Sequence, residues 1–252
     1  MLLDRIDIVG VVQLSEKLAM LIPPAVLKAI SKIRSGPFSQ TGMSREVKVV
    51  FDIGANIGDV TLAACRSFPQ ARIYAFEPVQ KTYAELLKNT SAYSDRVNAY
   101  PFGLFNENRK SVINISSFHG ASSIIPQSDD HKRVHQDLNI KEVGKEEIEL
   151  RTMDSFVEEA GIEKIDIIKI DVEGVEREVI QGGRNCLRNR VDNVLVELSL
   201  LRRNRESDYW IKICADLYDF GFMLINLYDV ARYKENDRTY LAQMDEFFSK
   251  TR

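Results

Sequence analysis

The fold is decided by the stretch Val49-Val50-Phe51-Asp52-Ile53-Gly54-Ala55-Asn56-Ile57-Gly58-Asp59-Val60-Thr61. Its apolar beginning predicts a buried strand, its two glycines predict a tight turn, and its end predicts the start of a helix. Gly54 allows the backbone to turn sharply and to approach a ligand without a Cβ in the way, while Gly58 allows close contact where the helix begins. The pattern therefore predicts that a ligand lies against the backbone at the tip of this strand.

Asp52, at the end of that strand, indicates which kind of ligand to expect. The turn is not followed by G-x-x-x-x-G-K-[ST], and G-x-G-x-x-G is absent, so a phosphate-cradling P-loop is excluded and a pyrophosphate site is disfavoured. A carboxylate at this point can accept hydrogen bonds from an ammonium group or a backbone amide. It suits the cationic methionine half of S-adenosylmethionine better than a pyrophosphate.

Glu77-Pro78 follows the next predicted strand, which reads Arg72-Ile73-Tyr74-Ala75-Phe76. An acidic side chain at the tip of the second strand of a dinucleotide-type fold is placed to accept hydrogen bonds from both ribose hydroxyls. Nicotinamide-dependent enzymes use the same device, so Glu77 by itself fits a nucleoside ligand of either kind.

Strand patterns alternate with helical patterns from Val47 onward, which is the order that builds a mostly parallel sheet with helices on both faces. Strands are expected near residues 47–53, 71–77, 97–102, 165–171, 193–198 and 222–228, and helices near 57–68, 80–90, 174–188 and 206–219. A last apolar segment, residues 246–249, is expected to add an edge strand. The predicted fold class is α/β, with a Rossmann-like doubly wound sheet.

One domain is expected over residues 46–252, with an insertion at about 104–164 that interrupts the alternation. The insertion carries two strand-like pieces, residues 111–115 and 148–151. Insertions of this kind often carry substrate specificity.

Residues 1–45 are expected to form an N-terminal helical extension that ends in a turn-rich linker. Pro23 and Pro24 interrupt its apolar pattern, which predicts two short helices. A helical cap on the main domain is the first interpretation. The alternatives are a substrate lid, a dimer arm, or contact of residues 1–35 with a membrane surface or a lipid-linked substrate.

Charge and cysteine content exclude several classes of protein. The formal net charge is -3, so there is no global basic field, and a nucleic-acid partner is not expected. The cysteines, Cys65, Cys186 and Cys214, are scattered in helical patterns, which argues against a disulfide framework or a zinc cluster and favours a reducing compartment. No run of about 18 apolar residues is present that could span a bilayer. We therefore expect a cytoplasmic protein, while the oligomeric state stays open.

Three segments carry a family resemblance, and they read Phe51-Asp52-Ile53-Gly54-Ala55-Asn56-Ile57-Gly58, Ala75-Phe76-Glu77-Pro78 and Ile165-Asp166-Ile167-Ile168-Lys169-Ile170-Asp171-Val172-Glu173-Gly174. Two further stretches support it, Arg151-Thr152-Met153-Asp154-Ser155-Phe156 and Gly120-Ala121-Ser122-Ser123. Over about residues 47–230 the sequence resembles the FkbM family of class I S-adenosylmethionine-dependent methyltransferases. The third segment is the most distinctive, because methyltransferases in general share only the first two.

The resemblance implies a seven-stranded sheet, mostly parallel with an antiparallel edge strand, and S-adenosylmethionine as the methyl donor. It most often implies O-methylation of a hydroxyl on a sugar, a glycan or a glycosylated natural product. The residues expected to contact the cofactor are Asp52, Gly54, Asn56, Gly58, Thr61, Glu77, Pro78, Asn106 and Asp171. Family members commonly have A-L-S-D where this chain has Gly103-Leu104-Phe105-Asn106, although Asn106 can still hydrogen-bond an adenine.

Three carboxylates are the first candidates for catalysis, because a hydroxyl acceptor must lose its proton to a general base or near a divalent cation. The fourth predicted strand of the sheet ends in Asp171-Val172-Glu173-Gly174 and the fifth in Glu197, and the carboxyl ends of parallel strands share one edge. Asp171, Glu173 and Glu197 can act there as a base or as ligands of Mg²⁺, which prefers oxygen. Glu173 can also serve only the N-terminus of the next helix.

The insertion supplies all three histidines. His119, beside Gly120, is a further candidate base. His131 and His135 have a spacing that suits a metal on one helical face, although a solvated loop is favoured because no third ligand of the same kind is near.

Side chains after the fifth strand are candidates for binding the acceptor. Arg202, Arg203 and Arg205 can bind an anionic acceptor, and Tyr209, Trp210 and Tyr228 can stack on a sugar, although aromatic residues at helical spacing are more often core.

Two other functions stay open on the sequence. A nicotinamide-dependent oxidoreductase would share Glu77 and the strand-end glycines, but the pyrophosphate glycine spacing and a Tyr-x-x-x-Lys pair are missing. A non-catalytic module with the same fold would bind a partner protein, but it has no need for glycine at both 54 and 58.

Overall fold

The computed structural model describes residues 38, 46–117, 119–126, 141–199, 208–235 and 238–251. The helices expected in residues 1–35 lie outside this part of the chain, as do His131, His135 and the arginines at 202, 203 and 205. In the described residues, no helix is long and apolar enough to cross a membrane.

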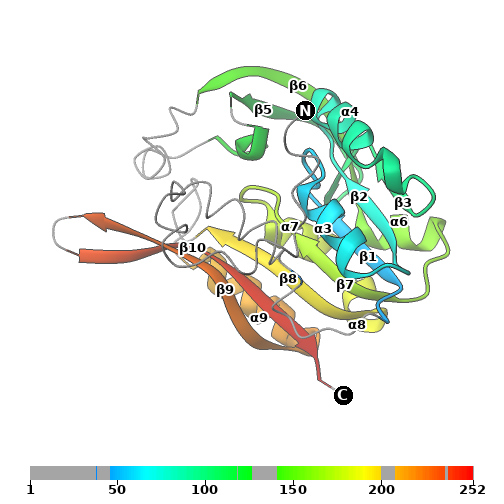
Figure 1. The fold of residues 1–252 in the computed structure, drawn as a ribbon. Coiled ribbons are helices and arrows are strands. Elements are labelled where there is room, and N and C mark those ends of the chain that lie inside the picture. Colours follow the sequence, from blue (N-terminus) through cyan, green and yellow to red (C-terminus); the bar gives the residue numbers. More distant parts are fainter. Residues whose placement is uncertain are drawn as a thin grey trace, which may run out of the picture.

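A seven-stranded sheet forms the centre of the described domain (Figure 1). Its order is β3 (Val97–Tyr100), β2 (Arg72–Phe76), β1 (Val49–Ile53), β7 (Ile165–Ile170), β8 (Val191–Ser199), β10 (Arg238–Lys250) and β9 (Phe222–Glu235). The pairs from β3 to β8 are parallel, and β10 runs antiparallel to both of its neighbours. The predicted α/β class with a mostly parallel, doubly wound sheet is confirmed.

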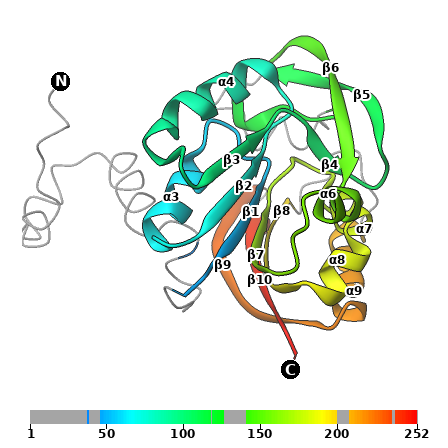
Figure 2. The same ribbon diagram turned by 90° about the vertical axis from the view of Figure 1, so that its right-hand side faces the viewer.

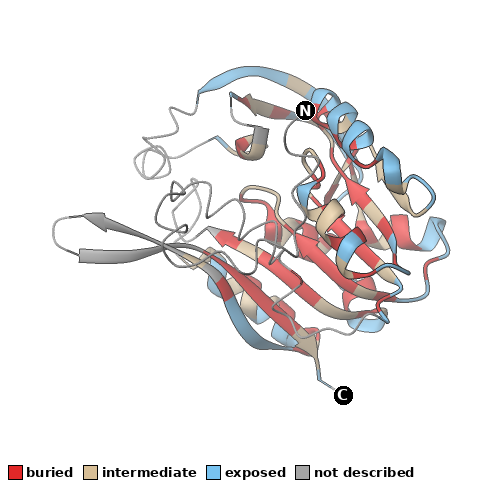
Figure 3. Cartoon of the chain, viewed as in Figure 1, coloured by how far each residue is buried: buried red, intermediate tan, exposed pale blue. Residues whose placement is uncertain are grey.

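The alternation of side chains along each strand fills two apolar layers, one on each face of the sheet. Phe51 and Ile53 face a core shared with α6 (Met153–Glu159), α7 (Glu176–Gly182), α8 (Arg184–Asn189) and α9 (Tyr209–Asp219). Val50 faces the opposite core, which includes Ala64 and Cys65 of α3 (Asp59–Ser67). Figure 2 shows α3 and α4 (Gln80–Asn89) on one side of the sheet and α6 to α9 on the other. Burial is concentrated in the central strands (Figure 3).

The position of β1 determines where a ligand is expected. The strands that follow β1 directly, β2 and β3, lie to one side of it, whereas β7 and β8 lie to the other. The chain therefore changes direction at the border of β1 and β7, and ligands of doubly wound sheets bind in the crevice beyond the carboxyl ends of the strands at such a point.

The insertion builds a second, small sheet with the order β4 (Gly103–Phe105), β6 (Glu142–Thr152) and β5 (Arg109–Ser116). The two strand-like pieces predicted at 111–115 and 148–151 are thus real strands, and both are longer than expected. After β5 the chain makes the short helix η3 (His119–Ala121).

Two expectations need correction. The single helix expected over 174–188 is two helices, α7 and α8, which meet at Gly182-Gly183. A Cβ on Gly182 would stand 1.8 Å from the carbonyl oxygen of Phe105, so the backbone of β4 packs directly against this glycine. The segment at 246–249 is part of the much longer β10, and it lies between β8 and β9, so that β9 is the outermost strand of the antiparallel edge.

Candidate functional site

The turn after β1 contains three residues with positive φ, at alternate positions, next to the neighbouring strands. Gly54, Asn56 and Gly58 have φ values of +82°, +51° and +96°, in the left-handed region that favours glycine. The amides of Gly54 and Ala55 both donate to the carbonyl oxygen of Phe76, at 3.0 and 2.9 Å. A Cβ on Gly58 would stand 2.8 Å from Cδ1 of Leu86 in α4, so this glycine lets the two helices approach. The sequence of the turn is therefore dictated by close packing on both sides.

Asp52 is buried at the tip of β1, with 1% of its surface exposed. Its Oδ2 accepts a hydrogen bond of 2.5 Å from Oγ1 of Thr61, the first-turn residue of α3. Burial raises the pKa of Asp52 to about 6, although the bond from Thr61 and the positive charge of Lys169 act in the opposite direction. The Thr61 side chain thus holds the carboxylate in place, and the contact with the cofactor expected of Thr61 stays a prediction.

Glu77 lies at the tip of β2 and is held by the backbone on both oxygens. Its Oε2 accepts from the amide of Asn56 at 3.0 Å, and its Oε1 accepts from the amide of Val79 at 2.9 Å. Burial raises the pKa of Glu77 to about 7, while these two backbone bonds lower it. A carboxylate has about four lone-pair sites, so two remain for hydroxyl donors. Pro78 packs near Gly103 of β4, where an added Cβ would stand 3.6 Å from its Cγ.

Asp171, Glu173 and Glu197 come together beyond the ends of β7 and β8. One carboxylate oxygen of each lies within 4.8 Å of those of the other two, and all three residues are partly exposed. The Asp171 amide donates to the Ile53 carbonyl at 3.0 Å, which joins this group to the β1 turn. Burial, followed by the charge of Asp171, raises the pKa of Glu197 well above its usual range. The structure therefore gathers the three carboxylates that the sequence placed at neighbouring strand ends.

Lys169 is a member of this group that the sequence analysis missed. Its Nζ lies 3.3 Å from Oδ1 of Asp245, and 3.9 Å from both Oδ2 of Asp171 and Oε2 of Glu197. Burial opposes the charge of Lys169, but Asp245, Asp171 and Glu197 outweigh it and raise its pKa above the usual range. A lysine inside the apolar run of β7 was the available signal, because a buried lysine needs a charged partner.

The other candidates have contacts elsewhere in the fold or lie outside what the structure describes. Asn106 is exposed just after β4, where its Cα lies beside Gly182 of α7. His119 begins η3, but its side chain is outside the described residues. The hydroxyl of Tyr209 accepts from the Arg177 amide at 3.0 Å and donates to Glu178 at 2.9 Å, so it ties α9 to α7.

Tyr228 is buried against Phe247 in the core, which is the position that the sequence favoured over stacking on a sugar. Trp210, by contrast, is exposed on α9.

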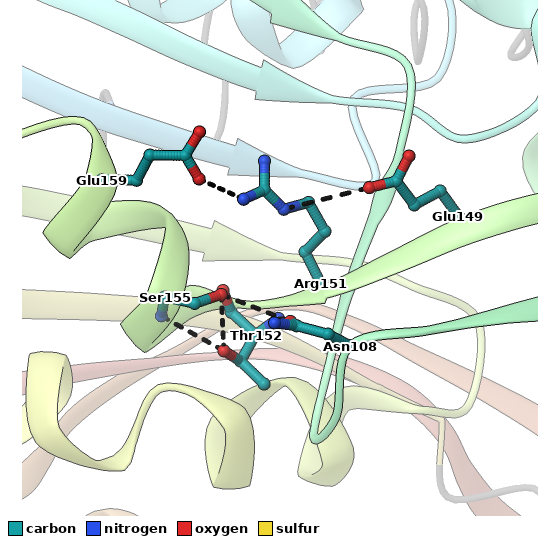
Figure 4. Close-up of polar contacts among 6 residues, drawn as sticks. All are labelled: Asn108, Glu149, Arg151, Thr152, Ser155 and Glu159. Atoms are coloured by element: carbon teal, nitrogen blue, oxygen red, sulfur yellow. Dashed lines mark hydrogen bonds and ion pairs between the residues drawn. The ribbon is translucent and has the colours of Figure 1, made fainter.

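The segment Arg151-Thr152-Met153-Asp154-Ser155-Phe156 joins the end of β6 to α6 and to Asn108 (Figure 4). Oγ1 of Thr152 accepts from the Ser155 amide at 3.1 Å and caps α6, while the Thr152 amide donates to Asn108. Arg151 lies between Glu149 and Glu159.

Asp154 in the same segment caps a second helix. Its two oxygens accept from the amides of Asn185 and Cys186, at 3.0 and 2.7 Å, at the start of α8. The motif is thus structural in its described contacts.

Comparison with known proteins identifies similar chains. A family model described as the methyltransferase FkbM domain matches residues 52–239. The 2-O-methyltransferase NoeI of Sinorhizobium fredii is 30% identical over 145 residues, which cover 55% of this chain and 58% of the relative. The hexuronic acid methyltransferase AglP of Haloferax volcanii is 30% identical over 155 residues, or 62% of this chain and 57% of the relative. The 31-O-demethyl-FK506 methyltransferase FkbM of Streptomyces tacrolimicus is 28% identical over 174 residues, or 60% and 65%.

A solved structure shares the fold. The methyltransferase FkbM from Methylobacillus flagellatus superposes with a TM-score of 0.52 at 13% identity, covering 85% of this chain and 47% of that one. The chain spans less than two thirds of the length of each of these similar proteins.

Proposed function

The chain belongs to the FkbM methyltransferase family, and on that premise we propose that it transfers a methyl group from S-adenosylmethionine to a hydroxyl of a sugar, a glycan or a glycosylated natural product. The name of NoeI supports an oxygen as the acceptor atom, and that of AglP supports a sugar acid as the acceptor class. The name of the Streptomyces protein supports an oxygen of a compound such as FK506. One observation carries the proposal: two buried carboxylates at the tips of β1 and β2 lie beside a cluster of three carboxylates at the ends of β7 and β8.

The groups at the tips of β1 and β2 fit S-adenosylmethionine by their chemistry. When bound, the cofactor supplies a methyl group on a positively charged sulfur. Glu77 has free lone pairs for the two ribose hydroxyls, while its bonds to the amides of Asn56 and Val79 keep the carboxylate in place. Asp52 adds a negative charge suited to the ammonium group of the methionine half. Family membership also disfavours the nicotinamide-dependent alternative and the non-catalytic module considered from the sequence.

Methyl transfer from a sulfonium needs orientation of the two reactants and no covalent protein intermediate. The protein must therefore bring the acceptor hydroxyl in line with the methyl group and take up its proton. We assign the proton to Asp171, because this carboxylate is partly exposed and its backbone is fixed to β1 through Ile53. Lys169 keeps a compensating positive charge beside it.

Glu197 and Glu173 belong to the same carboxylate cluster as Asp171. Because the pKa of Glu197 is raised, this side chain holds its proton to higher pH and can donate a hydrogen bond to the acceptor. We assign the cluster to proton transfer and acceptor binding, while the Mg²⁺ considered from the sequence stays an alternative that treatment with EDTA tests.

Two measurements on the full chain test the function. Isothermal titration is expected to show binding of S-adenosylhomocysteine, and incubation with S-adenosylmethionine is expected to add a methyl mass to a member of a panel of nucleotide sugars, lipid-linked glycans and glycosylated metabolites. Failure to bind either form of the cofactor would overturn the proposal. Binding of NADH, detected by fluorescence transfer, would favour an oxidoreductase in its place.

A further inference from the structure

Ser123, in the insertion, is connected by one part-buried hydrogen bond to the loop that carries Asp171 and Glu173. Only 3% of its surface is exposed. Its Oγ donates to the carbonyl oxygen of Glu173 at 2.7 Å and accepts from the Ile125 amide at 3.1 Å. Fifty positions of sequence separate the two ends of the first bond. This hydroxyl therefore links the small sheet to the edge of the main sheet.

The Ser123 end of the bond is firmly held on β5. The backbones of Asn114 and Ser123 exchange two hydrogen bonds, of 2.9 and 3.1 Å, and the Asn114 side chain donates to the same Ser123 carbonyl. The neighbouring Ser122 anchors the turn separately, because its Oγ accepts from the Ser116 amide at 3.1 Å. Ser123 is thus a fixed point from which the loop can be held.

At the Glu173 end of the bond, the backbone has an unfavourable conformation that neighbouring contacts must stabilise. Glu173 has φ +58° and Gly174 has φ +104°, so two successive residues lie in the left-handed region. For a residue with a Cβ this region is strained and persists only when its surroundings determine it. The Gly174 amide is held by Glu176 at 2.7 Å, and the Asp171 amide is held by Ile53. The bond from Ser123 falls between these two anchors, at the residue whose carboxylate faces the site.

We propose that Ser123 is a positioning residue for methyl transfer. By fixing the Glu173 carbonyl it sets the path of the Asp171–Gly174 loop, and so the directions of the Asp171 and Glu173 carboxylates. Through this one hydroxyl the insertion helps to position the catalytic carboxylates without touching the acceptor. This inference rests on the proposed function, since it assigns the loop to proton transfer.

Ser123→Ala tests the proposal, with Ser122→Ala as the matched control from the same turn. Loss of the hydroxyl is expected to lower kcat about tenfold or more, since small misplacements of reacting groups are costly, and to leave the affinity for S-adenosylhomocysteine within about twofold. Ser122→Ala, which loosens the turn but not the carboxylate loop, is expected to keep kcat within about twofold. Equal loss of kcat in both variants, or unchanged kcat in Ser123→Ala, overturns the proposal.

A readout that needs no acceptor separates this inference from the proposed function. Hydrogen exchange followed by mass spectrometry is expected to be faster in the peptide covering residues 171–176 of Ser123→Ala than in wild type or Ser122→Ala. Unchanged exchange there overturns the role of Ser123, whether or not the wild type transfers methyl groups. Absence of cofactor binding in the wild type overturns the proposed function alone. If Ser123→Ala does not fold, Ser123→Cys, whose thiol is a weak donor of similar size, is measured in the same way, and an unchanged kcat overturns the proposal.

Discussion

A Cβ built on Gly54 would stand 1.9 Å from the carbonyl oxygen of Asp171. Gly54 follows β1 and Asp171 follows β7, two parallel strands that pair up to Ile53 and Ile170. The turn expected to hold the cofactor and the loop expected to take the proton are thus packed against each other through backbone atoms. Because nothing separates them, a change that pushes one away from the sheet must also move the other.

Gly54→Ala is expected to damage both cofactor binding and stability. The added methyl group meets backbone, which cannot swing aside, and the φ of +82° is unfavourable for alanine by about 1 to 2 kcal/mol even without the clash. Titration with S-adenosylhomocysteine is expected to show at least about tenfold weaker binding. Gly161→Ala is the control, because Gly161 also has a positive φ, of +62°, but no atom lies within 4 Å of its added Cβ. Equal affinities of the two variants would show that the contact with Asp171 does not matter.

Glu77→Ala is expected to weaken cofactor binding without unfolding the protein. Removing a buried acceptor of one or two hydrogen bonds costs on the order of 1 to 3 kcal/mol, which corresponds to about 5-fold to 150-fold in the dissociation constant. Isothermal titration with S-adenosylhomocysteine measures the difference. Glu147→Gln, which changes an exposed carboxylate of β6, serves as the control and is expected to bind like wild type. If Glu77→Ala binds equally well, Glu77 does not belong to the site.

Cofactor affinity is expected to rise with pH. Burial raises the pKa of Glu77 to about 7 and that of Asp52 to about 6, whereas hydroxyl and ammonium donors bind the ionised forms. Below these values the free protein carries protons that binding must release, so affinity falls with decreasing pH.

Titrations between about pH 5 and about pH 8 are expected to show at least about a tenfold gain in affinity that levels off above the pKa of Glu77. Glu77→Gln cannot ionise, so the difference between wild type and this variant isolates the contribution of Glu77. A slope that is the same in both proteins would contradict the assignment.

Much of the fold could be predicted from the sequence because its local signals agree. The apolar run of β1, the glycine turn and the amphipathic α3 each indicate the same strand-turn-helix unit, and alternation does the same for the parallel strands. The break between α7 and α8 could not be predicted, because it depends on the approach of the Phe105 carbonyl to Gly182, a contact between segments far apart in the chain. The length of β10 and its position between β8 and β9 likewise depend on pairing between strands.

In the site, too, some residues could be predicted from the sequence and others depend on contacts between distant segments. Asp52, Glu77 and Asp171 stand at strand ends, where topology alone brings them to one edge. Lys169 and Asp245 were missed because they lie on different strands, β7 and β10, and their attraction is visible only once β10 is placed beside β8. Tyr228 was considered for acceptor binding because periodicity does not show which face of a strand is covered.

Asp171→Asn is expected to lower turnover much more than cofactor affinity. The amide keeps the size of the side chain but cannot accept the proton of the acceptor, and loss of a general base costs about 100-fold to 10,000-fold in rate. Comparing kcat with the affinity for S-adenosylhomocysteine separates the two effects, and Asp166→Asn, at the opposite end of β7, is the control. Equal losses of kcat and affinity would contradict a catalytic role. Loss of wild-type activity on treatment with EDTA would instead favour a divalent cation held by the carboxylate cluster.

Asp154→Ala is expected to lower stability while leaving catalysis unchanged. The carboxylate accepts from the amides of Asn185 and Cys186, and removing such a cap at a helix N-terminus costs about 0.5 to 2 kcal/mol. Thermal or urea denaturation measures this loss. The control is Glu159→Gln, which changes an exposed carboxylate of α6 that pairs with Arg151 and is expected to change stability by less than about 1 kcal/mol. At a temperature where both variants are folded, kcat is expected to stay within about twofold of wild type. A large fall in kcat at unchanged stability would instead give the Thr152–Phe156 segment a direct part in the reaction.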